Sequence, residues 1–225
     1  MILPNKKMKG FTLVELMLSM TFIAILLLSI TMLIVQIAGI YNKGITLREA
    51  DQAGQFVSSE LQRSFTQTFS QAVGTDAVQL PDGKGGRVCI GGDVYAWNYG
   101  EGIEEGSTIN VIGGSSDVRF VKFAGPADEY CEPLPDDSWQ AIPSNTTELL
   151  SPGNASLAIH SLEINEVELA QDDTQSIYEV NMVLGTTEGG LITSDQCNGA
   201  DKKDDEWCAV NEFSFTARSG NKQEG

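Results

Sequence analysis

The sequence is poor in the residues and motifs from which most catalytic centres are built. It contains one histidine, His160, in a stretch of strand-like alternation, where a structural role is expected. It has no G-x-S-x-G nucleophile elbow, no H-E-x-x-H zinc motif, no Walker phosphate loop and no G-x-G-x-x-G fingerprint. With one histidine, acid–base catalysis would depend on aspartates and glutamates, and their spacing in the sequence matches no recognisable catalytic arrangement. We therefore expect neither an enzyme nor a protein that holds a cofactor.

Basic residues are also few. The 225 residues include 14 lysines and arginines against 31 aspartates and glutamates, which gives a formal net charge of −17. Three of the basic residues, Lys6, Lys7 and Lys9, precede the first long apolar segment. The rest of the chain repels phosphates and anionic lipid head groups, so no direct nucleic-acid binding is expected. Such acidity is typical of the soluble surface of an exported protein.

Charge of either sign is missing between Leu16 and Asn42. Residues 16–40 are apolar on every face of a helix, and about 20 such residues span the hydrocarbon of a bilayer. The lysines before this run and their scarcity after it predict a cytoplasmic amino terminus and an extracytoplasmic domain. A cleaved secretory signal is the competing interpretation, but its apolar core is only about 7 to 15 residues long. Residues 35–39, VQIAG, resemble its cleavage site only weakly.

Glu15 stands at the edge of this apolar run, and no basic residue follows it within reach. A charged side chain at the centre of a membrane helix costs about 2.5–3.5 kcal/mol, and less near the interface, so acidic residues there are usually paired. If the chain is cut after Gly10, Phe11 gains a free α-amino group four residues before Glu15. That amine, in the same chain or a neighbouring copy, would pair strongly with Glu15 where the dielectric constant is low.

The segment KGFTLVELM, residues 9–17, resembles the type IV prepilin signature. In that family a short basic leader ends in glycine, and an aromatic residue and a glutamate are the first and fifth residues of the mature chain. The resemblance implies that residues 1–10 are a leader. It also implies that a prepilin peptidase cuts between Gly10 and Phe11 and methylates the new amine, and that Glu15 acts in assembly.

The resemblance further implies partners and a location. The mature helix, residues 11–42, would first lie in the inner membrane as a single-pass anchor. It would then pack against the amino-terminal helices of other pilin or pseudopilin subunits, in a filament on the cell surface or in the periplasm. Many major pilins have a proline at the position of Met32, and its absence here favours a minor pilin or a pseudopilin.

The pattern from residue 43 to residue 225 predicts an extracytoplasmic α+β domain of pilin-like type. Apolar residues spaced by three or four continue the helix to about residue 73; they are Ala50, Ala53, Val57, Leu61, Phe65 and Phe69. Strand candidates follow after Gly74, at residues 87–99, 118–125, 156–169, 176–186 and 211–219, with a turn at 80–86. This order favours a mainly antiparallel sheet packed on the second half of the helix.

Three segments of this domain resemble the J-type pseudopilins of type II secretion and the W-type minor pilins. They are READQAGQFVSSELQRSF (48–65), AIHSLEINEVEL (158–169) and EFSFTARSGN (212–221). This narrower resemblance implies a low-copy subunit that helps to initiate or cap a filament.

The four cysteines, Cys89, Cys131, Cys197 and Cys208, all follow the membrane segment. Export permits disulfides, and four cysteines allow three connectivities. The expected pairs are Cys89 with Cys131 and Cys197 with Cys208. Zinc is a poor alternative, because no two cysteines have two- or three-residue spacing and there is one histidine.

The sequence around the last two cysteines is acidic, and it supplies weak calcium candidates. They are Asp195, Asp201, Asp204 and Asp205. Calcium takes six to eight oxygen ligands, which an acidic loop can provide, but the spacing is not that of an EF-hand. A solvated acidic loop is the competing interpretation.

Two classes of function fit the sequence. The first is a minor pilin or pseudopilin that joins an extracytoplasmic filament used for secretion, DNA uptake, motility or adhesion. The second is a membrane-anchored extracytoplasmic enzyme or binding protein that acts alone. Glu15 distinguishes them, because only the first class needs it.

Overall fold

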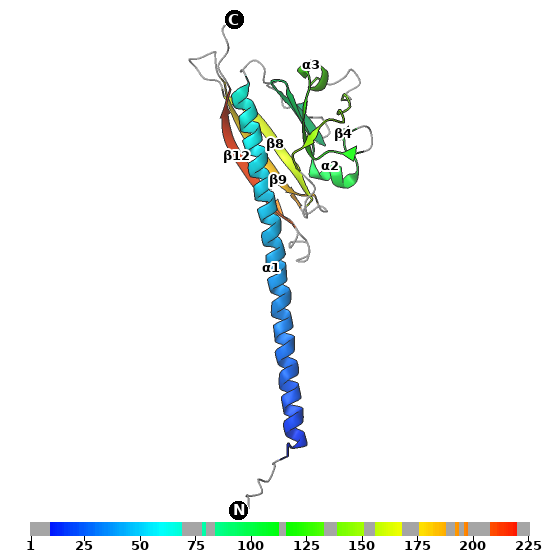
Figure 1. Cartoon of the computed structure of the whole chain (residues 1–225), viewed down its shortest axis with the longest axis vertical. Helices are drawn as coiled ribbons and strands as arrows, with labels where there is room; N and C mark the ends of the chain where they lie inside the picture. Colours follow the sequence, from blue (N-terminus) through cyan, green and yellow to red (C-terminus); the bar gives the residue numbers. More distant parts are fainter. Residues whose placement is uncertain are drawn as a thin grey trace, which may run out of the picture. The chain divides into compact units, whose positions relative to one another are not determined.

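The computed structural model of the chain has an α+β layout, in which one long helix precedes antiparallel sheets (Figure 1). The chain forms two compact units, which meet between Tyr41 and Asn42. The structure describes residues 10–68, 78–79, 84–112, 116–132, 139–150, 156–167, 176–187, 192–193, 196–197 and 208–219.

Helix α1 runs from Leu13 to Gln67. No proline interrupts it, so every interior residue can donate to the carbonyl four residues earlier. Its first half is long and apolar enough to cross a membrane, with a mean hydropathy of 2.6 over an 18-residue window. The helix ends before the expected residue 73, because the backbone bends at Thr68. Residues 69–73 lie outside the described residues.

Three long strands form one antiparallel sheet in the order β12-β9-β8. They are β8 (Leu157–Val167), β9 (Ile177–Thr186) and β12 (Val210–Arg218). Each matches an expected strand to within two residues at either end. Side chains alternate along β12, where Glu212, Ser214 and Thr216 are exposed while Ala217 is buried. One face of the strand is solvent-exposed and the other is covered. Alternation of this kind in the sequence was the basis for predicting the strands.

A second antiparallel sheet has five strands in the order β1-β2-β3-β6-β7. They are β1 (Val78–Gln79), β2 (Gly85–Ile90), β3 (Asp93–Asn98), β6 (Phe120–Ala124) and β7 (Thr147–Glu148). The expectation of one strand over 87–99 was wrong, because β2 and β3 form a hairpin. Its two-residue turn, Gly91–Gly92, needs a backbone that glycine adopts at no steric cost, and φ of Gly91 is 67°.

Shorter elements complete the described part of the second unit. They are α2 (Gly100–Glu105), α3 (Ala127–Tyr130), β4 (Val111–Ile112), β5 (Ser116–Asp117), β10 (Ile192–Thr193) and β11 (Gln196–Cys197). The expected turn at 80–86 lies mostly outside the described residues, and its last two residues begin β2.

One hydrophobic core joins α1 to both of these sheets. The expected apolar face of the helix is confirmed for Ala50, Val57, Leu61 and Phe65, each of which is fully buried. The ring of Phe65 stacks on that of Tyr178 in β9, with 5.0 Å between their centroids. Burying one such side chain contributes about 1.5–3 kcal/mol, so this face fixes the second half of α1 to its sheets.

Gly54 of α1 lies directly against Phe213 of β12. A Cβ atom at this position would overlap the ring of Phe213. The sequence suggests only a local softening of the helix at Gly54, since glycine costs up to about 1 kcal/mol in a helix interior. Gly54 instead makes room for an aromatic side chain of the sheet. Gly44 has no such neighbour, because nothing lies within 4 Å of a Cβ atom built there.

Alanine at these two glycines has opposite expected effects. Gly54→Ala forces Phe213 to move and destabilises the protein by about 1–3 kcal/mol, because the core is overpacked. Gly44→Ala stabilises it by up to about 1 kcal/mol through helix propensity alone. Urea unfolding of both variants measures the two changes. A Gly54→Ala variant as stable as the parent would show that the helix and β12 are not closely packed.

Candidate functional site

The amino-terminal end of α1 carries the residues that the sequence marks for processing and assembly. Gly10 and Phe11 are exposed and lie just before the helix, which begins at Leu13. Thr12 occupies the position before the first helical residue. Its hydroxyl oxygen accepts a hydrogen bond from the backbone N–H of Glu15 at 3.3 Å. Thr12 therefore caps the helix and satisfies one of the N–H groups that every helix start leaves free.

The carboxylate of Glu15 takes part in the same cap. The Thr12 hydroxyl donates to Glu15 Oε2 over 3.4 Å, so the two residues form a capping pair with Thr-x-x-Glu spacing. This pair was not predicted, although its Thr-x-x-Glu spacing is visible in the segment TLVE, residues 12–15. The contact is with a neutral hydroxyl, and among the described residues no cationic group lies within 4.0 Å of the carboxylate.

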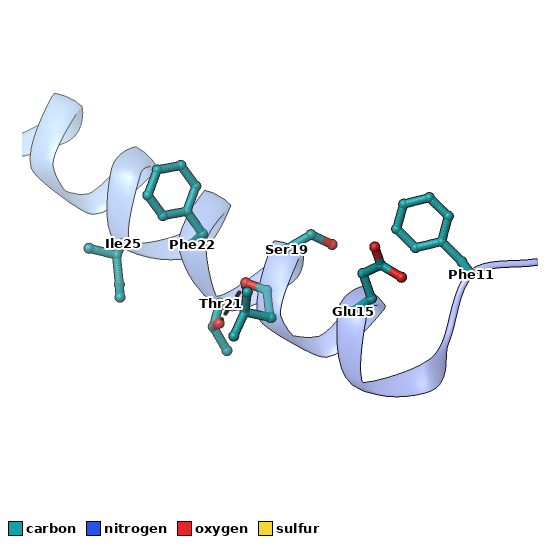
Figure 2. Close-up of a pocket in the computed structure, with 7 residues that line it drawn as sticks. Phe11, Glu15, Ser19, Thr21, Phe22 and Ile25 are labelled. Atoms are coloured by element: carbon teal, nitrogen blue, oxygen red, sulfur yellow. Dashed lines mark hydrogen bonds between the residues drawn. The ribbon is translucent and has the colours of Figure 1, made fainter.

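The surface that follows Glu15 is apolar and uncovered. Large apolar side chains from Phe11 to Ile40 are 44–74% exposed. A shallow groove near the helix start is lined by Phe11, Glu15, Leu18, Ser19, Thr21, Phe22 and Ile25. Figure 2 shows the Glu15 carboxylate in this groove, between the ring of Phe11 and Ser19. Exposure of such a surface to water is unfavourable, and burial in a bilayer or against other helices would remove this cost.

Hydroxyl groups within the apolar run bond to the helix itself. Ser19 donates to the carbonyl of Leu16 at 2.9 Å, and Thr31 donates to that of Leu27 at 2.8 Å. Thr21 and Ser29 make equivalent bonds. These side chains therefore need no partner from water, which lets the helix enter a medium without hydrogen-bonding groups. Glu15 differs from these hydroxyl groups, because the negative charge of a carboxylate cannot be neutralised by a hydrogen bond to a helix carbonyl.

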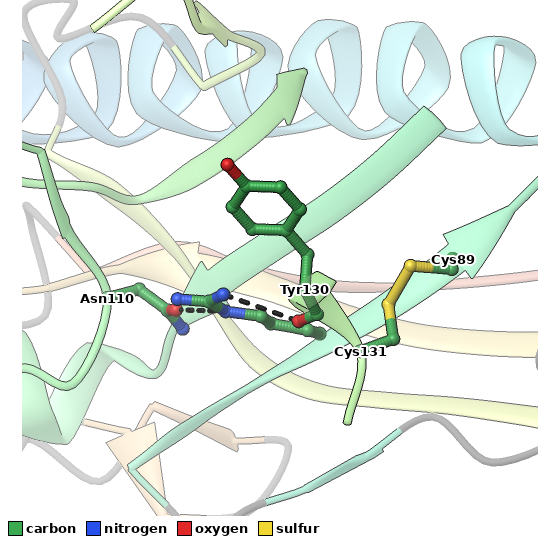
Figure 3. The surroundings of a disulfide bond; sticks show 5 residues. Cys89, Asn110, Tyr130 and Cys131 are labelled. Carbon is green, nitrogen blue, oxygen red and sulfur yellow. Dashed lines mark hydrogen bonds between the residues drawn. A yellow bond between two sulfur atoms is a disulfide. The ribbon is translucent and has the colours of Figure 1, made fainter. Parts of the chain in front are cut away.

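Both expected disulfides are present in the second unit. Cys89 pairs with Cys131, and Cys197 pairs with Cys208. The first bond joins β2 to the end of α3 across 42 residues of sequence (Figure 3). A loop of this length loses much conformational entropy on closure in the unfolded chain, so the bond favours the folded state.

A buried arginine reinforces this disulfide. Arg87, two residues before Cys89, is 1% exposed. Its guanidinium donates to the side chain of Asn110 at 2.8 Å and to the carbonyls of Tyr130 and Gln140 at 3.3 and 2.7 Å. Burial lowers the pKa of Arg87 to about 10, so the side chain keeps its charge at neutral pH. The disulfide and Arg87 together hold the segment around α3 against β2.

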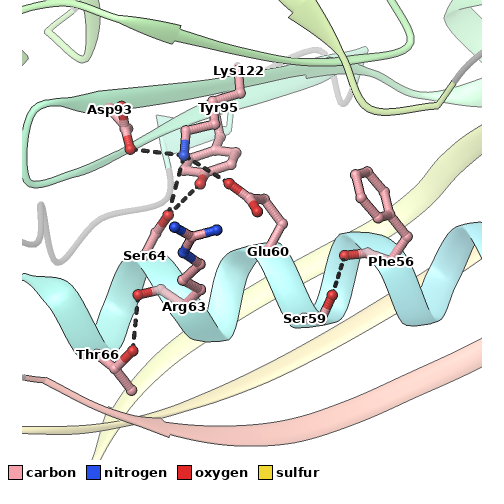
Figure 4. A network of polar contacts seen from close by, with 9 residues as sticks. All are labelled: Phe56, Ser59, Glu60, Arg63, Ser64, Thr66, Asp93, Tyr95 and Lys122. Atoms are coloured by element: carbon pink, nitrogen blue, oxygen red, sulfur yellow. Dashed lines mark hydrogen bonds and ion pairs between the residues drawn. The ribbon is translucent and has the colours of Figure 1, made fainter.

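A second polar network ties α1 to the five-stranded sheet (Figure 4). Lys122 Nζ lies 2.8 Å from Glu60 of the helix and 2.9 Å from Asp93 of β3. The hydroxyls of Ser64 and Tyr95 lie 2.6 Å apart beside it. Burial alone would lower the pKa of Lys122, but the bonds to the two carboxylates outweigh it and raise the pKa. A lysine held in its charged form cannot act as a base, so the network is a structural clamp.

His160 also has a structural position. It lies at a β-bulge, where the register of β8 against β9 shifts between Ile159 and Ser161. Its Nε2 is 3.1 Å from the carbonyl oxygen of Thr186. Burial lowers the pKa of His160, and the nearby carbonyls offset this only in part. The neutral ring, with Nε2–H donating to Thr186, is therefore the form that the fold favours.

The calcium candidates Asp195, Asp201, Asp204 and Asp205 lie outside the described residues. Within the described ranges, no three His, Cys, Asp or Glu side chains are grouped closely enough to hold a metal ion.

The lowered pKa of His160 predicts a specific pH dependence. Its stabilising effect is complete above the pKa of the unfolded chain, about 6.5, and is lost as the pH falls through the lower folded-state pKa. The free energy of unfolding of the parent should therefore exceed that of His160→Gln by more at pH 8 than at pH 5. Glutamine supplies an uncharged amide donor and removes the titration. A difference that does not change with pH would show that His160 does not titrate on unfolding.

No protein-family model matches this chain, and comparisons with curated proteins and with solved structures find no similar protein.

Proposed function

We propose that this chain is a minor pilin or pseudopilin subunit. After cleavage between Gly10 and Phe11 and methylation of the new amine, it joins a filament of the type IV pilus or type II secretion kind. The proposed role is to help initiate or cap that filament. A prepilin peptidase and other pilin or pseudopilin subunits are its proposed partners.

One observation carries the proposal. Glu15 is a carboxylate without a cationic partner among the described residues, one turn after the proposed cleavage point and at the head of an uncovered apolar helix. Cleavage before Phe11 would place an α-amino group four residues away, on the same end of the helix. In a medium of low dielectric constant, such an amine attracts the carboxylate far more strongly than the Thr12 hydroxyl does.

The exposed surface of α1 supports a role in a polymer. Apolar side chains project from all sides of its first half, so the half that lies before Asn42 cannot be the helix of an ordinary soluble domain. Lipid covers such a surface before assembly, and the equivalent helices of other subunits cover it afterwards. Both environments require internal hydrogen bonds, which the serines and threonines of this segment make.

The second unit gives less support to a membrane-tethered enzyme acting alone. The side chains most suited to proton transfer, Lys122 and His160, are both occupied in structural contacts. A groove of this unit is lined by glutamines, serines, phenylalanines and one glutamate, Glu212. Among the described residues no hydrogen bond joins one of these serines to Glu212, as a nucleophile would be joined to its base.

The charge of Glu15 gives the sharpest test. Glu15→Gln keeps the size of the side chain and the Gly10–Phe11 junction but removes the charge, so the leader should still be cleaved while the chain stays in the membrane. Breaking a buried ion pair costs about 3–5 kcal/mol. The amount of the chain incorporated into filaments should therefore fall by more than a hundredfold. Quantitative immunoblotting of sheared filaments and of membranes measures the distribution.

Glu15→Asp is the matched control, because it keeps the charge with one methylene fewer. The Glu15→Asp variant should be incorporated into filaments at a substantial fraction of the parent's level, unlike Glu15→Gln. Incorporation of Glu15→Gln at the level of the parent would contradict the proposed function and favour a membrane-anchored protein that works alone.

A further inference from the structure

The solvent side of α1 in the second unit carries a continuous stripe of exposed residues. Its members are spaced by three or four positions, which places them on one face of the helix. We call it the outer stripe, and it consists of Ile45, Arg48, Gln52, Phe56, Ser59 and Arg63. It lies opposite the buried face that contains Val57 and Leu61.

Phe56 is the central feature of the outer stripe. Its side chain is 53% exposed, although it belongs to a helix whose other phenylalanine in this unit, Phe65, is fully buried. The Ser59 hydroxyl donates to the carbonyl of Phe56 at 2.8 Å, so this serine is satisfied within the helix (Figure 4). Covering the exposed part of this ring would remove apolar surface from water, so Phe56 is suited to anchor a partner.

Arg48 and Arg63 flank Phe56 on the outer stripe. Among the described residues, no carboxylate lies within 4.0 Å of either guanidinium. Two acidic side chains of the same stretch are bonded elsewhere: Asp51 accepts from Gln55 at 2.9 Å, and Glu60 accepts from Lys122 at 2.8 Å. The outer stripe itself thus carries two positive charges and no negative one, with Glu49 and Glu60 along its border, on a chain whose formal net charge is −17.

The position of the two arginines argues against a second copy as the partner. Parallel pairing of two outer stripes in register would place each arginine against its own equivalent. Antiparallel pairing centred on Phe56 would place Arg48 against Arg63, because these residues lie eight before and seven after Phe56. Like charges in direct opposition are destabilising in both arrangements.

We infer that the outer stripe binds an acidic helix of a different subunit of the same filament, an inference that rests on the proposed function. The two arginines are 15 positions apart, or about 22 Å along the helix. The partner helix should therefore present two carboxylates about 22 Å apart, with small side chains between them that admit the ring of Phe56. Opposite charges would select and orient this partner, and the aromatic ring would supply apolar contact.

Site-specific photo-crosslinking in cells that make the filament tests the inference. Phe56 is replaced by the photoreactive benzoyl-phenylalanine, and the adducts of the full chain are mapped by mass spectrometry. The expected adduct joins Phe56 to a helix of a different protein, with a carboxylate about two turns away on either side. Arg48→Glu and Arg63→Glu should each reduce its yield about tenfold, because each places like charges together.

A matched control and a rescue make the result specific. Arg218→Glu reverses an exposed arginine of β12, away from the outer stripe, and should leave the adduct unchanged. Changing the facing carboxylate of the partner to lysine should restore the adduct of Arg63→Glu. An adduct only with a second copy or with lipid, or a yield that neither arginine affects, would overturn the inference.

Two measurements in the same cells, the amount of the chain in sheared filaments and the yield of the crosslink, test the proposed function and this inference separately. If the chain is present in sheared filaments but the crosslink is absent or insensitive to charge, the outer stripe is not a docking surface, although the filament role stands. If the chain is missing from filaments altogether, the proposed function itself fails.

Discussion

The charge of Glu15 at the head of an uncovered apolar helix is the constraint on which the proposed function of this chain depends. Within the described residues its only polar partner beyond the backbone is the hydroxyl of Thr12, at 3.4 Å. A neutral donor at this distance offsets little of the cost of placing a carboxylate in an apolar medium. The described residues therefore place no cation beside Glu15, and the proposed cleavage before Phe11 would supply one.

The two halves of α1 differ in how much of their surface the rest of the chain covers. The first half exposes apolar side chains on all sides, and the second half buries one face in a core of aromatic and aliphatic residues. Lys122, which bridges Glu60 and Asp93, adds a polar clamp between this second half and the five-stranded sheet. The disulfide at Cys89 and the buried Arg87 then brace the far side of that sheet. A rigid domain of this kind can present the outer stripe in a fixed orientation.

The spacing of apolar residues in the sequence predicted the helix and strands of this fold better than it predicted the contacts between distant residues. The long helix and the three strands of the β12-β9-β8 sheet were expected, because each leaves a pattern of spacing in the sequence. Both disulfides also match the expected pairs, although the spacing of four cysteines allows three connectivities. The hairpin at Gly91 was missed, since β2 and β3 are buried on both faces and their apolar residues form nearly one run around the turn. Gly54 and Arg87 were misjudged or overlooked because their roles depend on residues far away in the sequence, Phe213 and the carbonyls of Tyr130 and Gln140. The capping role of Thr12, in contrast, was present in the local spacing.

The most direct test of the central claim is the chemical identity of the amino terminus in filaments sheared from cells. Mass spectrometry of the amino-terminal peptide should show a chain that begins at a methylated Phe11 and retains Glu15. Its copy number should be well below that of the main subunit. A chain that still carries Lys6, Lys7 and Lys9, or one that begins beyond the apolar segment, would show that no liberated amine pairs with Glu15.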